Sequence, residues 1–307
     1  MAKILSHLTF ALDMLGLDTK IRQIEKKLTD QGDTELAKLS EKLSILEELK
    51  KFALGQFLIA NQGINGIWSH YISYEYPRLS ESQKPQNPME RMLIEIIGSD
   101  LRIRLELVKE LLQKELDENR RDRISLLSVP CGVMADLSTL DFSRIEEYSL
   151  FGVDLDPDVL KKAKEFNENY ALGSHTTFDC KDAWNLELDS QFDVIVCLGL
   201  NIYVKEMERL LGLYSSLRKT LKPGGKLMLS FPTPEPMHDP HTERHFKGLN
   251  PDAVRLRRII FYEIVEIGFG KAFSSLETTN QLKKVGFQKV EIKHSPNNSP
   301  NIAIATK

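Results

Sequence analysis

A tight turn and an acid near the middle of the chain have the types and spacing needed to hold a nucleoside. One apolar run turns at Pro130-Cys131-Gly132, and a second apolar run, over residues 148–154, closes on Asp154. Such a turn exposes backbone N–H groups to a ligand, and a carboxylate at the next strand end accepts hydrogen bonds from ribose hydroxyls. The two segments therefore predict the nucleoside-binding half of a doubly wound α/β sheet.

Three later segments continue the alternation of strands and helices that such a sheet requires. Each combines an apolar run with an acidic or glycine-containing turn at its end. The segments are residues 178–204, with strand ends at Asp182-Ala183 and Leu198-Gly199, residues 217–231, with a Lys222-Pro223-Gly224-Gly225 turn before a fifth strand, and residues 281–292. Each motif alone is weak evidence for such a sheet, but their occurrence together and in register is specific evidence for it.

Together these motifs resemble the class I S-adenosylmethionine-dependent methyltransferases, in the order in which that family uses them. The resemblance covers roughly residues 122–307. It implies an α/β fold with a Rossmann-like, seven-stranded methyltransferase sheet that has helices on both faces. It also implies that S-adenosyl-L-methionine is the cofactor.

The resemblance further implies roles for individual residues. Asp154 is expected to bind the ribose hydroxyls, Leu155 to lie against adenine, and Asp182 to accept from the exocyclic amine. The backbone of the first turn is expected to contact the amino-acid portion. The full set of implied cofactor-binding residues is Pro130, Cys131, Gly132, Asp154, Leu155, Asp182, Ala183, Leu198 and Gly199.

The first loop departs from the family pattern. Ser128 stands where an acid is usual, Pro130 where the first glycine is usual, and Met134 where the last is usual, while Gly132 keeps its place. Proline cannot take a positive φ, so this turn must have another shape. Asp136, a helical turn further on, is a candidate substitute for the missing acid. A degenerate fold that binds no cofactor remains an alternative.

Composition indicates a globular protein that lacks the positive electrostatic field by which proteins attract nucleic acid. The 307 residues are 41% hydrophobic and carry a formal net charge of −3, which predicts one or two domains with a sizeable core. No apolar run reaches the roughly 18 residues of a membrane span. The start of the chain lacks the basic region and cleavage site of a signal peptide. A cytoplasmic location with no membrane partner is therefore predicted.

The cysteines support the same compartment. Their number is odd, and all three fall at or near strand ends of the predicted sheet, which favours buried, reduced thiols. They are Cys131, Cys180 and Cys197.

The first third of the chain has helical rather than strand periodicity. Residues 34–60 predict one long amphipathic helix, and Ser99 is the predicted N-cap of a further helix. The apolar positions behind these patterns are Ile4, Leu8, Leu15, Leu17 and Ile21, then Leu36, Leu39, Leu43, Leu46 and Leu49, then Leu105, Val108, Leu112 and Leu116. An all-helical lid or substrate domain over residues 1–121 is predicted before a cofactor-binding domain over 122–307, with a cap insertion over 232–271.

An aromatic segment stands out within the predicted helical domain. Gly63, Asn65 and Gly66 break the helix just before it. Because tyrosine and tryptophan pair apolar area with a polar tip, Trp68 and Tyr71 are candidates for a lid over the cofactor. Packing between domains is the competing interpretation, and it is favoured for the neighbouring tyrosines, Tyr74 and Tyr76.

A second polar insertion follows the fifth strand, where open α/β sheets bind ligands. His238, His241 and His245 lie within residues 232–246, among four prolines that argue against a helix. Histidine can remove a proton near neutral pH, so these are the candidate catalytic residues. The alternatives are a metal site built from the three imidazoles and a solvated loop; no metal is predicted.

Methyl transfer needs mainly alignment of nucleophile, methyl carbon and sulfur, so the sequence does not specify the acceptor. Residues 198–203 lack the Asn/Asp-Pro-Pro-aromatic signature of enzymes that methylate planar nitrogens. The predicted function is therefore methylation of a small-molecule oxygen or nitrogen, without a nucleic-acid partner. A cofactor-binding or interaction protein of the same fold and a protein methyltransferase are the alternatives.

Overall fold

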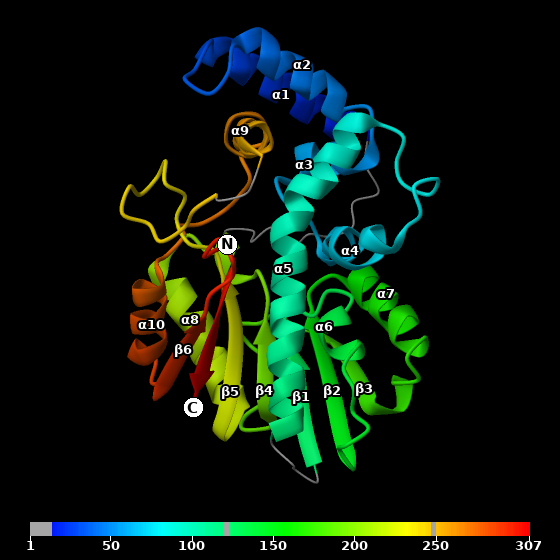
Figure 1. The fold of residues 1–307 in the computed structure, drawn as a ribbon, viewed down its shortest axis with the longest axis vertical. Coiled ribbons are helices and arrows are strands. Elements are labelled where there is room, and N and C mark those ends of the chain that lie inside the picture. Colours follow the sequence, from blue (N-terminus) through cyan, green and yellow to red (C-terminus); the bar gives the residue numbers. More distant parts are fainter. Residues whose placement is uncertain (1–13, 119–122, 247–249) are drawn as a thin grey trace. The chain divides into compact units, whose positions relative to one another are not determined.

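The chain folds into two compact units, whose elements are drawn in Figure 1. The computed structural model describes residues 14–118, 123–246 and 250–307. The helical unit comprises Met1–Ser99 and Phe246–Gly268, and the sheet unit comprises Asp100–His245 and Phe269–Lys307.

The predicted domain boundary, between residues 121 and 122, falls outside the described residues, as do Ile4 and Leu8. The predicted division into residues 1–121 and 122–307 therefore stays a prediction.

The helical unit is built from short helices. Its elements are α1 (Met14–Gln31), α2 (Leu39–Leu49), α3 (Ala53–Asn61), α4 (Gly66–His70), a π-helix (Tyr71–Glu75), a 3-10 turn (Tyr76–Arg78), the start of α5 (Pro88–Glu118), α9 (Pro251–Arg258) and a second π-helix (Ile259–Ile264). The break predicted between residues 61 and 66 is confirmed, because Asn65 caps α4 by accepting from the Trp68 N–H at 3.0 Å.

Two helix predictions are wrong. Residues 34–60 form two helices, because Phe52 is extended, with φ −143° and ψ 155°. A Cβ on Gly55 would lie 2.1 Å from the Leu49 carbonyl oxygen, so the glycine allows α3 to begin directly against the end of α2. Ser99 lies inside α5, where its hydroxyl donates to the Ile96 carbonyl at 3.0 Å, and it caps nothing.

The sheet unit contains seven strands in the order β3-β2-β1-β4-β5-β7-β6. The strands are β1 (Arg123–Ser128), β2 (Glu147–Asp154), β3 (Thr176–Cys180), β4 (Phe192–Cys197), β5 (Leu221–Phe231), β6 (Lys289–Lys293) and β7 (Asn301–Thr306). Neighbours are parallel except at β7, which is antiparallel to both β5 and β6. The predicted turn at residues 222–225 lies within β5, as a register shift in its pairing with β4.

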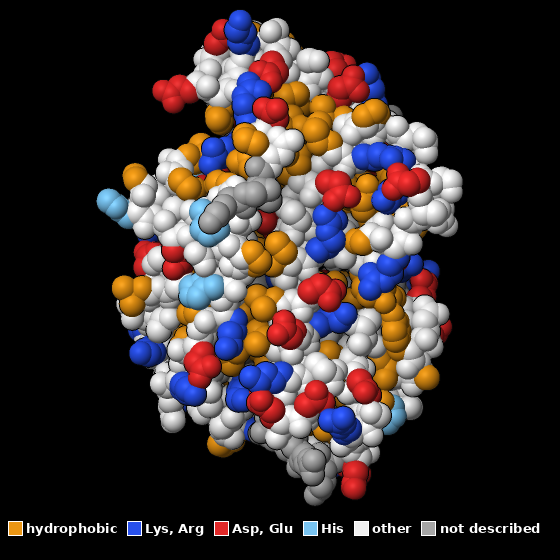
Figure 2. Space-filling view, in the orientation of Figure 1, with side chains coloured by type: hydrophobic (Ala, Val, Ile, Leu, Met, Phe, Trp, Pro, Cys, Tyr) orange, Lys and Arg blue, Asp and Glu red, His pale blue; other side chains and the backbone are white. Residues whose placement is uncertain are grey.

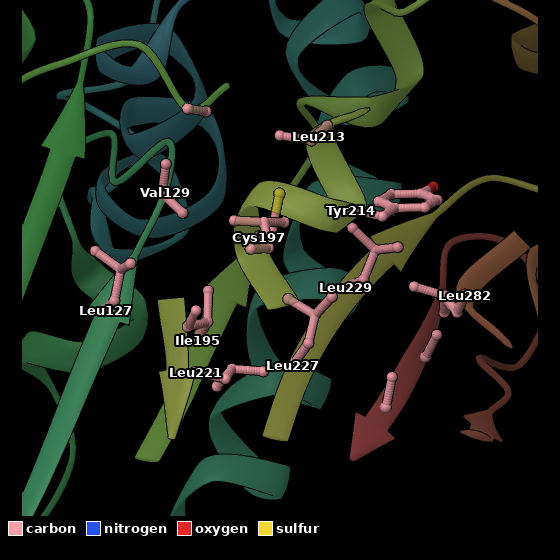
Figure 3. Packing of buried hydrophobic residues seen from close by; sticks show 14 of the residues in the cluster. Leu127, Val129, Ile195, Cys197, Leu213, Tyr214, Leu221, Leu227, Leu229 and Leu282 are labelled. Carbon is pink, nitrogen blue, oxygen red and sulfur yellow. The ribbon is translucent and has the colours of Figure 1, made fainter. Parts of the chain in front are cut away.

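Helices cover both faces of this sheet, as the alternation along its central strands requires. Val194 and Val196 of β4 pack in one cluster with Leu112 of α5, whereas Ile195 and Cys197 pack in the other. The first face is covered by the second half of α5 and by α6 (Ala135–Ser138) and α7 (Pro157–Glu168); the second by α8 (Met207–Thr220) and α10 (Ser275–Lys284). Figure 3 shows the second cluster between strands and helices. The predicted fold class is confirmed.

Two further properties bear on the predictions from composition. Cys131 and Cys197 are buried, but Cys180 is exposed, so the prediction of a buried thiol is wrong there. Cys180 is the last residue of β3, an edge strand that has a neighbouring strand on one side only. Over the described parts of the chain, no helix combines the length and apolar character that crossing a membrane requires.

Candidate functional site

The carboxyl ends of β1 and β4 meet where the strand order of the sheet reverses. From β1 the chain continues outward to β2 and β3, and from β4 outward to β5. Ligands of open α/β sheets bind at such a switch point. The site is therefore built from the loops that follow β1, β2 and β4.

The loop after β1 is held against β2 by backbone hydrogen bonds. Cys131 N donates to the Val153 carbonyl at 2.8 Å, and Gly132 N donates to Asp154 Oδ2 at 3.0 Å. Gly132 and Met134 both have positive φ, 52° and 64°, and the Val129–Pro130 bond is cis. Because an L side chain rarely adopts this conformation, a fixed loop shape must hold Met134 there.

Asp154 links two turns. Its Oδ2 accepts from Gly132 N, and its Oδ1 accepts from Asp156 N at 3.1 Å. Burial raises the pKa of Asp154, and hydrogen bonds from the backbone N–H groups of Asp156, Gly132 and Leu155 oppose that shift. A carboxylate has about four acceptor positions, so capacity remains for ligand hydroxyls. The next side chain, Leu155, is 41% exposed, which leaves an apolar surface open beside the acid.

Asp156, two residues after Asp154, has a structural role. Its Oδ1 accepts from Asp158 N at 3.0 Å and from Val159 N at 3.3 Å, and so caps α7, which begins at Pro157. Proline at the first helical position fits because its missing N–H has no partner there in any helix. Asp156 therefore caps α7, whereas Asp154 holds the loop after β1.

Ser128 and Asp136 lie together beneath the first loop. The Ser128 hydroxyl donates to Asp136 Oδ2 at 2.8 Å. Burial raises the pKa of Asp136 to about 6, against the opposing effects of the Ser128 hydrogen bond and two backbone N–H groups. The serine that replaces the family's usual acid is thus hydrogen-bonded to the acid one turn later, the candidate substitute from the sequence.

The loop after β3 is oriented by its own hydrogen bonds. Asp182 is exposed, and its Oδ1 accepts from Trp184 N at 3.0 Å. Ala183 is buried and accepts from the Ser216 hydroxyl at 2.9 Å. Trp184 donates to the Arg209 carbonyl at 2.8 Å, so its indole faces α8.

Arg104, on α5, is a charged residue of the site that the sequence did not single out. Its Nη1 lies so close to Gly199, after β4, that a Cβ there would be 2.6 Å away. Gly199 also has φ +84°, a conformation suited to glycine. Leu198, its partially buried neighbour, packs against the sheet core. Helical periodicity assigns Arg104 to a face of α5 but gives no information about which loop that face meets.

The three candidate histidines are exposed on a loop that is fixed at several points. His238, His241 and His245 all face solvent. No helix forms over residues 232–246, as the prolines predicted. The loop is held by hydrogen bonds from Thr233 Oγ1 to the Asn298 carbonyl, from Asn298 Nδ2 to the Glu243 carbonyl, and from Ser275 N to Glu243 Oε1. Among the described residues, no three histidine, cysteine or acidic side chains are grouped to hold a metal.

The aromatic segment packs on itself within the helical unit. The Trp68 ring lies 6.2 Å from that of Phe57 and 5.8 Å from that of Tyr71, between centroids. Tyr71 in turn meets Tyr76 edge-on at 6.2 Å, and burial raises the pKa of both tyrosines. Trp68 and Tyr71 keep part of their surface accessible, whereas Tyr76 is 3% exposed.

Comparisons place these features among known proteins. A family model described as a methyltransferase domain matches residues 127–225. The carboxy-S-adenosyl-L-methionine synthase of Desulfotalea psychrophila is 30% identical over 200 residues, which cover 59% of this chain and 74% of that protein. The sterol 24-C-methyltransferase of Debaryomyces hansenii is 23% identical over 168 residues, 54% of this chain and 40% of that protein. The chain thus spans about two fifths of the sterol enzyme's length.

One solved structure is similar over almost the whole chain. The crystal structure of a possible exported protein from Bordetella parapertussis has a TM-score of 0.87 and 27% sequence identity, and the alignment covers 96% of each chain. The residues before β1 are therefore part of that similarity.

Proposed function

Because this chain belongs to the class I S-adenosylmethionine-dependent methyltransferase family, we propose that it methylates a small-molecule oxygen or nitrogen. The chain is a methyltransferase, and S-adenosylmethionine is its cofactor. The observation that carries the proposal is the linked pair of turns at Gly132 and Asp154, beside the open surface of Leu155, at the switch point of the sheet. This geometry suits an adenosine whose ribose meets Asp154.

In the proposed mechanism, the cofactor supplies an activated methyl group and the chain supplies alignment. The carboxyl group of Asp154 binds the ribose hydroxyls, Leu155 lies against adenine, and Asp182 accepts from the exocyclic amine. The backbone from Pro130 to Gly132 and the Leu198-Gly199 turn border the remainder of the cofactor. Fixing the methyl carbon in line with the acceptor converts a bimolecular step into an effectively unimolecular one.

The small-molecule acceptor is supported by charge. On the face drawn in Figure 2, Lys and Arg are interspersed with Asp and Glu, without one extended field of positive charge. Proteins that bind nucleic acid usually concentrate positive charge on one face. We also propose a cytoplasmic location, supported by three free thiols, one of which is exposed.

The function is tested by binding followed by turnover. S-Adenosylmethionine and S-adenosylhomocysteine should both bind the full chain in a calorimeter. With S-adenosylmethionine carrying an isotopically labelled methyl group, a pool of small metabolites should acquire the label. Label found only in protein would instead support protein methylation, and binding without any transfer of label would contradict the proposed function.

A second candidate reaction follows from one relative. The Desulfotalea psychrophila protein is named for a product that carries a carboxyl group on S-adenosylmethionine. In a reaction of that class, the sulfonium compound is the substrate rather than the donor of its methyl group. Mass spectrometry of the adenosyl products separates the two candidates. Methyl transfer yields S-adenosylhomocysteine, whereas in the second reaction a carboxyl group from a second substrate replaces one hydrogen of S-adenosylmethionine, so that the sulfonium product is heavier by the mass of carbon dioxide.

A histidine of the loop over residues 232–246 is the proposed general base. Replacing His238, His241 and His245 singly with alanine should lower turnover in one variant and leave S-adenosylhomocysteine affinity unchanged in all three. Full activity in every variant would contradict this role, and stoichiometric zinc or iron lost from the His241→Ala protein would replace it with a metal site.

Trp68 and Tyr71 are the proposed lid residues. Trp68→Ala and Tyr71→Ala should each weaken S-adenosylhomocysteine binding by about two- to tenfold, the range expected for the loss of one aromatic contact. Tyr74→Ala is the matched control and should bind normally. Trp68 and Trp184 are the chain's two tryptophans, so fluorescence quenching that is lost in Trp184→Phe but kept in Trp68→Phe would argue against a lid.

A further inference from the structure

Trp68, Tyr71 and Tyr76 form a row of aromatic rings in the helical unit. Trp68, in α4, is three residues before Tyr71, the spacing of neighbours on one side of a helix. The π-helix that begins at Tyr71 continues the row, because Tyr76 N donates to the Tyr71 carbonyl across its wider turn. Such turns occur frequently at functional sites, so the row is a candidate ligand surface.

A positively charged side chain already covers a neighbouring ring. The Arg78 guanidinium carbon lies 3.8 Å from the centroid of the Tyr74 ring. Within the described part of the chain, no lysine or arginine stacks on Trp68 or Tyr71. Both of these rings keep part of their surface accessible. Since the faces of indole and phenol rings attract cations, the two rings are suited to a cation that comes from outside the chain.

Glu90 brings a negative charge to the same rings. Burial raises the pKa of Tyr71 most, and the nearby charge of Glu90 raises it further. Glu90 is partly exposed in the first turn of α5. Within the described residues, neither its carboxyl group nor the Tyr71 hydroxyl has a hydrogen-bond or ion-pair partner. Glu75, which also acts on Tyr71, lies 3.3 Å from His70 Nε2. Glu90 is therefore the acid that a ligand would meet.

The basic side chains near the end of the row are paired with a different acid. Lys84 and Arg91 lower the pKa of Tyr76, and both form ion pairs with Glu81. Neither of them shifts the pKa of Glu90, which burial alone raises. The charge of Glu90 is thus not neutralised by a cation of the described chain, and it complements a positively charged ligand.

We propose that Trp68, Tyr71 and Glu90 bind a positively charged amine or quaternary ammonium group of the methyl acceptor. Aromatic faces recognise such groups, and a carboxylate beside them adds attraction between opposite charges. The proposal rests on the proposed function, because the ligand is the methyl acceptor, and it gives the proposed lid residues a second role.

The charged group serves for recognition and is not the group that reacts. An ammonium nitrogen has no lone pair, so the oxygen or nitrogen that receives the methyl group is a different atom of the same molecule. The acceptor is favoured over the sulfonium of S-adenosylmethionine as the source of the charge. The residues predicted to border the cofactor all belong to the sheet unit, whereas Trp68, Tyr71 and Glu90 belong to the helical unit.

The first arm of the test titrates the full chain with tetramethylammonium chloride and with tert-butanol, a neutral molecule of similar size, and follows tryptophan fluorescence. The wild-type protein should bind the cation more tightly, with a signal that persists in Trp184→Phe and disappears in Trp68→Phe. Tyr71→Leu should weaken binding of the cation about two- to thirtyfold, the range of a cation–π contact. Glu90→Gln should weaken it about two- to fivefold, as for a partly exposed ion pair. Glu35→Gln, at an exposed acid of the same unit, is the matched control and should bind normally.

The second arm repeats the titration in the presence of each S-adenosyl compound. S-Adenosylmethionine should leave the binding of tetramethylammonium intact. Displacement by S-adenosylmethionine, but not by S-adenosylhomocysteine, which lacks the sulfonium charge, would overturn the proposal by assigning the site to the cofactor.

Two further results would overturn the proposal. One is binding of the cation that is absent or no tighter than that of the alcohol. The other is a Glu90→Gln protein that loses thermal stability but keeps its affinity for the cation, since the acid would then only stabilise the N-terminus of α5. If Tyr71→Leu unfolds, Glu90→Gln, a change of similar size at a partly exposed position, decides the outcome. A selective cation site in a protein that transfers no methyl group would contradict only the proposed function.

Discussion

Asp154→Ala should weaken the binding of S-adenosylhomocysteine by about ten- to hundredfold. A hydrogen bond to a charged group contributes about 1.5–3 kcal/mol, which corresponds to this range of affinity. The substitution removes the proposed ribose contact and also the acceptor for Gly132 N and Asp156 N. The loop after β1 then loses its side-chain contact to β2, so part of the loss comes from ordering the loop on binding.

Two variants separate these contributions in a calorimetric titration. Asp154→Asn keeps one carbonyl oxygen and should give an intermediate affinity. Asp158→Ala removes an exposed acid from the first turn of α7 and should bind normally. Unchanged affinity in Asp154→Ala would remove this residue from the ribose site.

Asp136→Asn should make the protein more stable at pH 7, by up to about 3 kcal/mol in the free energy of unfolding. Burial raises the pKa of Asp136 from 3.8 to about 6, and each pKa unit corresponds to about 1.4 kcal/mol. The folded state therefore binds a proton more tightly than the unfolded state. The contribution of Asp136 to the free energy of unfolding of the wild-type protein is therefore greatest below about pH 4, and it declines as the pH rises towards 6.

The difference between variant and wild type should thus widen from about pH 4 to 6 and stay constant above it, as measured by urea unfolding. Ser128→Ala is the matched control, because it removes the hydroxyl that stabilises the charged carboxylate. It should lower stability at pH 7 by about 1 kcal/mol. A less stable Asp136→Asn protein at pH 7, or a difference that does not change with pH, would contradict the linkage.

The central sheet could be predicted because its strands are buried on both faces. Such strands appear in the sequence as short apolar runs with a turn or an acid at the end. Strand β4 (Phe192–Cys197), which lies within the predicted segment over residues 178–204, is such a run. The local sequence is enough to predict such a strand, because a central strand is covered on both faces along its whole length and nearly all of its residues must therefore be apolar.

The structural features that the sequence did not predict depend on contacts between residues that are distant in sequence. Phe52 interrupts a leucine pattern that is regular on both sides, because α2 and α3 each bury their own leucines. Nothing next to Arg104 in sequence indicates that it meets Gly199. The sequence indicated that Asp136 could substitute for the acid that is usual at position 128, but it did not indicate that Ser128 donates a hydrogen bond to Asp136. Positions of the predicted cofactor residues follow from strand ends, but their partners do not.

The hydrogen bond between Gly132 N and Asp154 has a consequence for redesigning the enzyme. The same carboxylate would recognise the ligand and fix the backbone that covers it, so the two properties cannot be changed independently. A variant made to accept an altered ribose would also release the loop, and a second substitution would be needed to restore its shape. The proposed selectivity for the sugar and the rigidity of the loop therefore depend on the same side chain, Asp154.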